Sequence, residues 1–330
     1  MKKIINHPDD FVNESIQGLV ISYPEIYKFS SDTNNVLKRT NKASNKVGLV
    51  SGGGSGHLPL FTGYIGEGLL DSCAIGNVFA SPSVDEISTA IKEANSGKGV
   101  LCIYGNYGGD VMNFDMASEM LQMEDIKVES IVVADDVASA SLQEKEKRRG
   151  VTGMLYVFKI TGAIAETGAD FDEVKRIAIK TNENIRTMGI ALTPTILPQA
   201  GKPTFEIGND EMEIGMGIHG EPGIRRGKLK TANEITDELS EKLLNDINLS
   251  NGDRVSVLIN SLGATPHEEL FIVSNKFNNI LKDKGINNIK SYVGRYATSM
   301  EMAGMSISIL KLDDELEKLL LVNANCPFWY

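Results

Sequence analysis

Cysteine is scarce in this chain, with only Cys73, Cys102 and Cys326 among 330 residues. Their spacing contains no close cysteine pair, which argues against a zinc ribbon, and it does not suggest a disulfide framework. We therefore expect neither a metal site nor a cofactor. Histidine is almost as rare, with four residues, and two of the four stand in glycine-rich segments.

The chain also lacks an excess of positive charge and a long apolar run. Acidic residues outnumber basic ones by 44 to 33, for a net charge of −11. Direct nucleic-acid binding depends on Lys and Arg that neutralise phosphates, so this charge argues against it. No stretch is long enough to span a membrane, and the start lacks the apolar segment of a signal peptide. We expect a cytoplasmic protein that binds neither nucleic acid nor membrane.

One compact basic cluster is present, at residues 145–149, where lysines and arginines alternate with glutamates. We interpret this cluster as the solvated end of a helix.

The first half of the chain alternates short apolar runs with amphipathic segments, which is typical of an α/β domain with parallel strands. We expect strands at 46–50, 99–104 and 128–134, and helices at 13–23, 84–94, 113–123 and 171–185. Residues 152–165 form a mixed stretch without a clear period.

The sequence pattern changes at residues 187–204, where three prolines and Gly201 interrupt the hydrophobic periodicity. We place a domain boundary there and predict one domain at 1–186 and another at 187–330. In the second, strands are expected at 211–218, 254–260, 289–294 and 305–312. Helices are expected at 235–247 and after Thr265, which we interpret as its cap.

The glycine run Ser-Gly-Gly-Gly-Ser-Gly-His, residues 51–57, follows a predicted strand. Its backbone N–H groups can converge on an oxygen-rich ligand. It is not a Walker loop, because no Gly-Lys-Ser/Thr ends it, and His57 and Pro59 stand where the helix of a dinucleotide site should begin. A tight structural turn explains the run equally well.

A second loop, residues 106–110, follows the next predicted strand and ends in Asp110. Asp110 is either an N-cap or a group that accepts a proton from a ligand hydroxyl. Both loops should meet at one edge of the sheet, where α/β proteins bind ligands. Asp135 and Asp136 follow a further strand, and we interpret them as capping residues.

His219 stands in Gly-Met-Gly-Ile-His-Gly-Glu-Pro-Gly, residues 215–223. Glycines on both sides let a ligand approach the ring. A neutral imidazole can add to a carbonyl carbon, which would select ketones or aldehydes over polyols. Glu221 is near enough to orient the ring, although His219 could also be a solvated turn residue. We assign no function to His7 or His267.

Five motifs, at 48–57, 63–66, 106–114, 217–223 and 260–266, together resemble the dihydroxyacetone kinase K-subunit family. The resemblance implies a two-domain fold, with a three-layer α/β/α domain around a largely parallel sheet and a second α/β domain with a mixed sheet. It also implies a homodimer and a hemiaminal between His219 and dihydroxyacetone. His57 and Asp110 would then be hydroxyl-binding and acid/base partners. The backbone cradle and substrate contacts would comprise Gly54, Ser55, Gly56 and Gly105.

The chain departs from the family at five positions. Leu58 replaces a glutamate, Phe61 a small residue or histidine, Gly105 a lysine, Gly108 a threonine and Val84 a proline. We expect all five to lie around the ligand. Phosphoryl transfer depends on positioned cations and polar groups, and these replacements remove such groups. They therefore favour a protein that senses the ligand over a subunit of a working kinase.

Such a sensor would resemble the DhaQ-type coactivator, which binds dihydroxyacetone and acts through a TetR-like DNA-binding regulator of a dihydroxyacetone-utilisation operon. The alternative is a catalytic K subunit that presents bound dihydroxyacetone to a nucleotide-binding L subunit.

Overall fold

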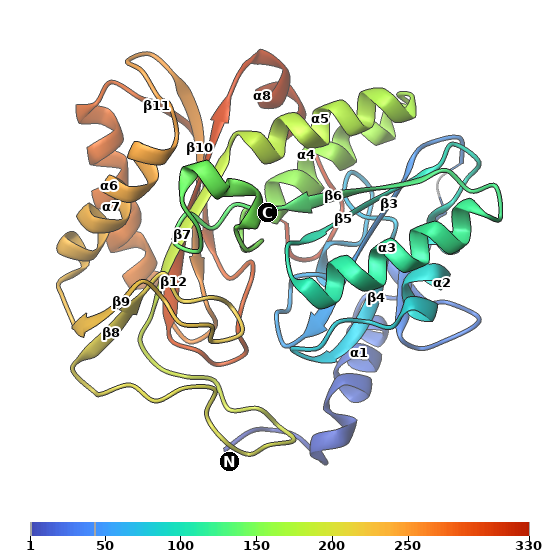
Figure 1. Ribbon diagram of the computed structural model, residues 1–330, viewed down its shortest axis with the longest axis horizontal. Coiled ribbons are helices and arrows are strands. Elements are labelled where there is room, and N and C mark those ends of the chain that lie inside the picture. Colours follow the sequence, from blue (N-terminus) through green and yellow to red (C-terminus); the bar gives the residue numbers. More distant parts are fainter. Residues whose placement is uncertain (1, 43, 330) are drawn as a thin grey trace.

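The computed structural model describes residues 2–42 and 44–329, and its strands form two six-stranded sheets (Figure 1). The first sheet has the order β1-β2-β4-β3-β5-β6, and the second has the order β11-β10-β12-β7-β8-β9. The strands of the first sheet are β1 (Tyr27–Phe29), β2 (Val36–Arg39), β3 (Gly48–Ser55), β4 (Ser72–Val78), β5 (Val100–Gly105) and β6 (Val128–Val133). Those of the second are β7 (Ile185–Ala191), β8 (Glu211–Ile214), β9 (Arg225–Lys228), β10 (Arg254–Ser261), β11 (Asn287–Gly294) and β12 (Gly304–Leu312).

Helices cover both sheets. They are α1 (Phe11–Ser22), α2 (Val84–Ala94), α3 (Gly108–Gln122), α4 (Met154–Glu166), α5 (Phe171–Glu183), α6 (Ala232–Asp246), α7 (His267–Asp283) and α8 (Asp314–Leu320). In the first sheet β4, β3, β5 and β6 run parallel, whereas β1 and β2 are antiparallel at one edge. In the second sheet only β10 and β11 pair in parallel. The predicted class, an α/β protein with one largely parallel and one mixed sheet, is confirmed.

Helix α4 lies between the two sheets (Figure 1). Tyr156 on α4 places its hydroxyl 3.0 Å from that of Ser256 on β10, and Lys159 donates to the carbonyl of Leu319. The sequence of α4 looked mixed because the helix is apolar on nearly every side, as a fully buried helix must be. One apolar cluster therefore runs through both halves of the chain. The predicted boundary at 186/187 falls inside β7, and the division into two domains stays a prediction.

The glycine run is strand rather than loop. β3 continues to Ser55, which pairs with Val78 of β4. The glycines permit close packing there: a Cβ on Gly52 would lie 2.9 Å from the carbonyl oxygen of Ala74, and one on Gly53 would enter the ring of Phe61. The turn begins only at Gly56, whose φ of 101° favours glycine.

The cap assigned to Thr265 is wrong. Pro266 is the N-cap of α7, and the hydroxyl of Thr265 instead donates to the carbonyl of Gly304 on β12. Thr265 therefore ties the loop to the second sheet.

The basic cluster at 145–149 is not wholly solvated. Arg148 is 1% exposed and donates to both carboxylate oxygens of Asp246. Arg149 pairs with the buried Asp136. These arginines are structural because each satisfies a carboxylate that the fold removes from water.

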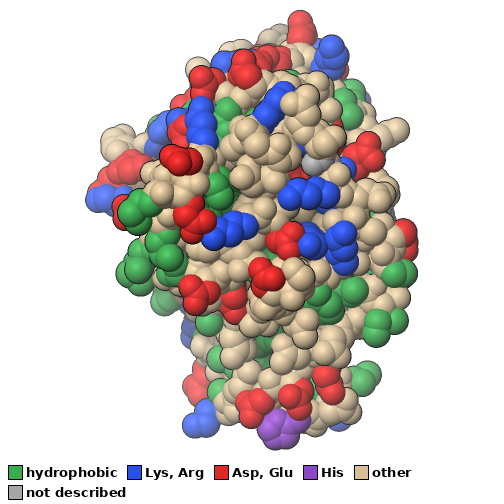
Figure 2. All heavy atoms as spheres, turned by 90° about the vertical axis from the view of Figure 1, so that its right-hand side faces the viewer, with side chains coloured by type: hydrophobic (Ala, Val, Ile, Leu, Met, Phe, Trp, Pro, Cys, Tyr) green, Lys and Arg blue, Asp and Glu red, His purple; other side chains and the backbone are tan. Residues whose placement is uncertain are grey.

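Acidic and basic side chains are interspersed on the face shown in Figure 2. Within the described part of the chain, no helix is both long and apolar enough to cross a membrane.

Candidate functional site

The loop that carries His219 follows β8 and turns at Gly215, where φ is 76°. His219 Nδ1 lies 2.8 Å from Glu221 Oε1, and its backbone N–H donates to Glu221 Oε2 at 2.9 Å. Burial alone would raise the pKa of Glu221, but the hydrogen bond from His219 outweighs it and lowers the pKa to about 2. Glu221 is therefore a carboxylate that accepts the proton on Nδ1, so that Nε2 is the ring nitrogen left to act as a nucleophile. The suggestion that Glu221 orients the ring is confirmed.

His57 is completely buried, and its ring centre lies 4.7 Å from that of His219. Nδ1 of His57 is 2.6 Å from the carbonyl oxygen of Thr298. Because a carbonyl only accepts, Nδ1 carries the proton and Nε2 does not. Burial, with the nearby His219, lowers the pKa of His57 to about 3, so the ring is neutral at pH 7. Nε2 has no hydrogen-bond partner among the described residues.

Two aromatic rings enclose the histidines. Phe79 stacks on His57 with ring centres 4.8 Å apart, and Tyr107 meets His219 edge-on at 4.8 Å. Phe79 has a φ of 56°, which is uncommon for a bulky residue and stores strain of about 1–3 kcal/mol. Sequence reasoning missed both residues. Tyr107 stood inside a motif already identified, whereas nothing in the sequence indicates the unusual backbone of Phe79.

Asp110 lies in the first turn of α3 and is 6% exposed. The N-cap of α3 is Tyr107, and no side chain caps the helix, so the capping interpretation of Asp110 is excluded. Burial raises the pKa of Asp110, opposed by a hydrogen bond with Ser81 and by His219. Oδ1 is buried without a partner in the described structure. Asp110 therefore offers an unsatisfied acceptor close to His219.

Arg149 fixes the start of the loop that carries His219 through hydrogen bonds. It donates to Asp136 Oδ2 at 2.9 Å and to the carbonyl oxygen of Gly215 at 2.8 Å. Asp135 instead accepts two backbone N–H groups at the start of α4. Asp136 also accepts a backbone N–H, that of Ala138, on Oδ1 at 3.0 Å. Both acids thus satisfy backbone N–H groups, as capping residues do, although neither is the N-cap of a helix. The ion pair between Asp136 and Arg149 was not predicted from the sequence.

The predicted backbone cradle lies at the ends of β3 and β5. A Cβ on Gly56 would come within 2.8 Å of the Phe79 ring, and one on Gly105 within 3.1 Å of the Tyr107 ring. The hydroxyl of Ser55 donates to the carbonyl of Gly76 at 2.8 Å. Gly54 and Gly56 are thus near the histidines, and contact of Gly54, Ser55, Gly56 or Gly105 with a ligand stays a prediction.

The five departures do not all surround the histidines. The ring of Phe61 meets that of His57 edge-on, with ring centres 6.4 Å apart. Leu58 and Phe61 also line a cavity whose walls do not include Asp110 or His219. Val84 is the first residue of α2 and packs on the core between α2 and α3. Gly105 and Gly108, however, flank Tyr107. The expectation of one cluster around the ligand is therefore wrong for Val84, which packs on the core, and it stays a prediction for the other four residues.

The other two histidines lie elsewhere and are exposed: His7 accepts a backbone hydrogen bond at the N-terminal turn, and His267 begins α7. Among the four, only His57 and His219 form a pair.

The sequence model of the Dak1 domain family matches residues 17–328 of this chain. The chain belongs to the Dak1 domain family. This Dak1 chain is 46% identical, over 96% of its length and 95% of the relative's, to the "PTS-dependent dihydroxyacetone kinase 1, dihydroxyacetone-binding subunit DhaK" of Listeria innocua. It is 45% identical to the corresponding subunit of Lactococcus lactis, over 95% and 94% of the two chains. Among solved structures, the "Dihydroxyacetone kinase operon co-activator Dha-DhaQ" superposes with a TM-score of 0.88 at 34% identity, covering 94% and 96% of the chains.

Proposed function

We propose that this protein captures dihydroxyacetone as a hemiaminal on His219. The observation that carries the proposal is the orientation of the ring: Glu221 holds Nδ1, so Nε2 presents its lone pair. Nε2 would bond to the carbonyl carbon, and the carbonyl π electrons would pass to oxygen, which takes up one proton from solvent. The positive charge that the ring gains faces the Glu221 carboxylate.

Two unsatisfied acceptors explain why the ligand should carry hydroxyl groups. His57 Nε2 and Asp110 Oδ1 are buried and unpartnered in the described structure. A buried acceptor without a hydrogen bond costs about 1–3 kcal/mol, so a hydroxyl that donates to it is favoured. Dihydroxyacetone carries one hydroxyl on each side of its ketone and can serve both acceptors.

Calorimetric titration with dihydroxyacetone tests this proposal. We expect His219→Ala to abolish binding and the exposed control His267→Ala to leave it unchanged. Unchanged binding by a folded His219→Ala protein would show that the nucleophile is assigned wrongly.

We further propose that capture serves sensing, through a TetR-like DNA-binding partner and a homodimeric form of this protein. Two glycines beside Tyr107, Gly105 and Gly108, support this role, since they replace a cation and a hydroxyl. A missing charged contact removes roughly 2–4 kcal/mol of transition-state stabilisation. The likeness to the co-activator structure agrees with this role.

The second candidate is a working K subunit that presents dihydroxyacetone to a phosphoryl-donating partner. The 46% identity to the dihydroxyacetone-binding kinase subunit of Listeria innocua favours it. Incubation with dihydroxyacetone and a competent donor subunit separates the two, with an active K subunit as positive control. A sensor yields no phosphorylated product, whereas turnover comparable to the control would establish the kinase role.

A further inference from the structure

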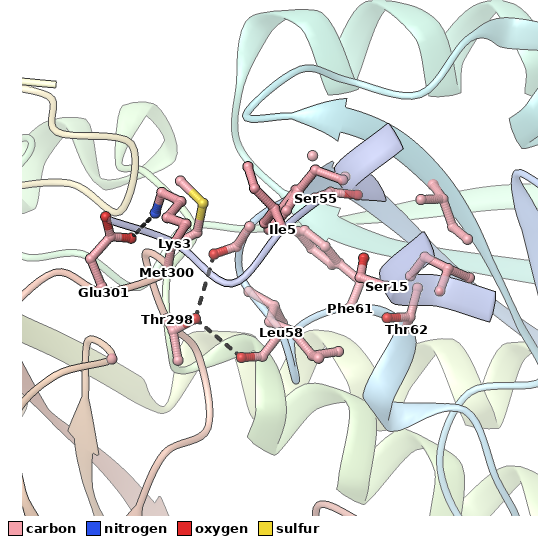
Figure 3. Close-up of a pocket in the computed structure, with 18 of the residues that line it drawn as sticks. Lys3, Ile5, Ser15, Ser55, Leu58, Phe61, Thr62, Thr298, Met300 and Glu301 are labelled. Carbon is pink, nitrogen blue, oxygen red and sulfur yellow. Dashed lines mark hydrogen bonds and ion pairs between the residues drawn. The ribbon is translucent and has the colours of Figure 1, made fainter. Parts of the chain in front are cut away.

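A large cavity lies between the end of β3, the segment after His57 and the N-terminal residues (Figure 3). Its volume is about 690 Å³, which falls within the range of about 300–1,000 Å³ typical of small-molecule sites. Its lining residues do not include His57, Asp110 or His219, but they do include Gly54, Ser55 and Gly56 of the predicted backbone cradle. The cavity therefore adjoins the ketone site at the end of β3 without including its two histidines.

The interior of this cavity is mainly apolar. Leu60 and Phe61 form one wall, Ile75 of β4 contributes from the sheet, and Phe11 and Ile16 of α1 contribute from the other side. The two family departures Leu58 and Phe61 change this lining: Leu58 replaces a charged glutamate, and Phe61 adds a large apolar ring where the family has a small residue or a histidine. Burial of an apolar ligand here is favoured by about 25 cal/mol for each Å² removed from water.

Cations stand at the same cavity. Lys3 is paired with Glu301 at one end of it (Figure 3), which neutralises that carboxylate. Lys2 and Arg295 also line the cavity, and within residues 2–42 and 44–329 neither forms an ion pair. The side chain of Arg295 makes one long hydrogen bond, 3.5 Å, to the carbonyl of Met300. A guanidinium so weakly engaged can bind a carboxylate with two parallel hydrogen bonds.

We propose that this cavity is a second ligand site, which binds an apolar molecule bearing one carboxylate. The apolar part of the ligand would lie against Phe61 and Ile75, and its carboxylate would bind Arg295. The site shares a wall with the ketone site, because Thr298 lines the cavity while its carbonyl accepts the proton of His57 Nδ1. Its occupancy does not require the ketone chemistry.

Calorimetric titration with decanoate tests the proposal on the full chain. We expect saturable binding of one decanoate per chain, and at least about tenfold weaker binding of the neutral analogue decanol, because the charged hydrogen bond is lost. Arg295→Gln should weaken the binding of decanoate by a similar factor. The control Lys228→Gln, which changes an exposed lysine outside the cavity, should leave the affinity for decanoate unchanged.

A space-filling variant locates the ligand. Ser15 is exposed on α1 and lines the cavity, so Ser15→Trp should fill it without disturbing the core. Ser22→Trp, at the end of the same helix and outside the cavity, is the control.

Absence of saturable binding, or an affinity for decanoate that Ser15→Trp leaves unchanged, would overturn the proposal. Decanol that binds as tightly as decanoate would overturn the assignment of the carboxylate to Arg295. His219→Ala should bind decanoate as the wild type does, which separates this site from the proposed ketone capture.

Discussion

At the scale of single residues, the site depends on two imidazole rings whose protons are fixed by acceptors. Glu221 fixes that of His219, and the carbonyl of Thr298 fixes that of His57. The sequence indicated Glu221 because it lies two residues away. It could not indicate Thr298, which is 241 residues from His57. Partners of this kind come from tertiary structure and leave no local pattern.

The buried state of His57 predicts a pH dependence of stability. Its pKa falls from an ordinary 6.5 to about 3 on folding, so between these values the unfolded chain binds the proton and the folded one does not. Stability should therefore fall as the pH is lowered from 6.5 towards 3, by up to about 1.4 kcal/mol for each pH unit.

The comparison that isolates this effect is denaturant unfolding of the wild type and His57→Asn, whose amide can still donate to Thr298. The difference between their free energies of unfolding should change over that pH range and be constant above it. Parallel curves throughout would contradict the assignment.

At the scale of elements, both halves of the site are held by contacts that glycine permits. The motif pattern predicted the placement of residues 51–57 and 215–223 beside a ligand, but it treated the first as a loop. Periodicity cannot show that a glycine run is the end of a buried strand, since the run has no side chains to alternate. The role of Arg149 was hidden for a different reason: a basic cluster with interleaved glutamates is usually solvated.

Gly217→Ala tests the packing of the His219 loop. A Cβ there would lie 2.1 Å from Glu221 Oε2 and 2.6 Å from Arg149 Nη1. Both atoms are ends of flexible side chains, so we expect a small change in stability, under about 1 kcal/mol, but displacement of Glu221 from His219. Affinity for dihydroxyacetone should drop by at least about tenfold, the effect of losing a hydrogen bond to a charged group.

The matched control is Gly18→Ala on α1, where a Cβ meets nothing within 4 Å. Calorimetry and thermal unfolding of the two variants measure binding and stability separately. Full affinity in Gly217→Ala would show that the Glu221 contact is dispensable.

At the scale of the whole molecule, α4 joins the two sheets into one core. The alternation of strands and helices was enough to predict an α/β fold with parallel pairing. It was not enough to predict α4, because a helix buried on all sides has no amphipathic period. The antiparallel edge strands β1 and β2 also escaped prediction, since three or four residues carry too little pattern.

Lys159 offers a test of this buried layer. Burial lowers its pKa from 10.5 to about 8, so between these values the unfolded chain binds the extra proton. The wild type should gain stability relative to Lys159→Met as the pH rises from 8 to 10.5. Unfolding of both proteins in denaturant across this range measures the difference, and a difference independent of pH would place the ammonium group in water.

The central claim is that Nε2 of His219 bonds to the ketone carbon of dihydroxyacetone. Carbon NMR of the protein with dihydroxyacetone labelled at its carbonyl carbon tests this directly. The account predicts that the bound ligand loses its ketone resonance and gains one typical of a tetrahedral carbon, and that His219→Ala shows no such signal. A bound ligand whose carbonyl resonance remains that of a free ketone would contradict it.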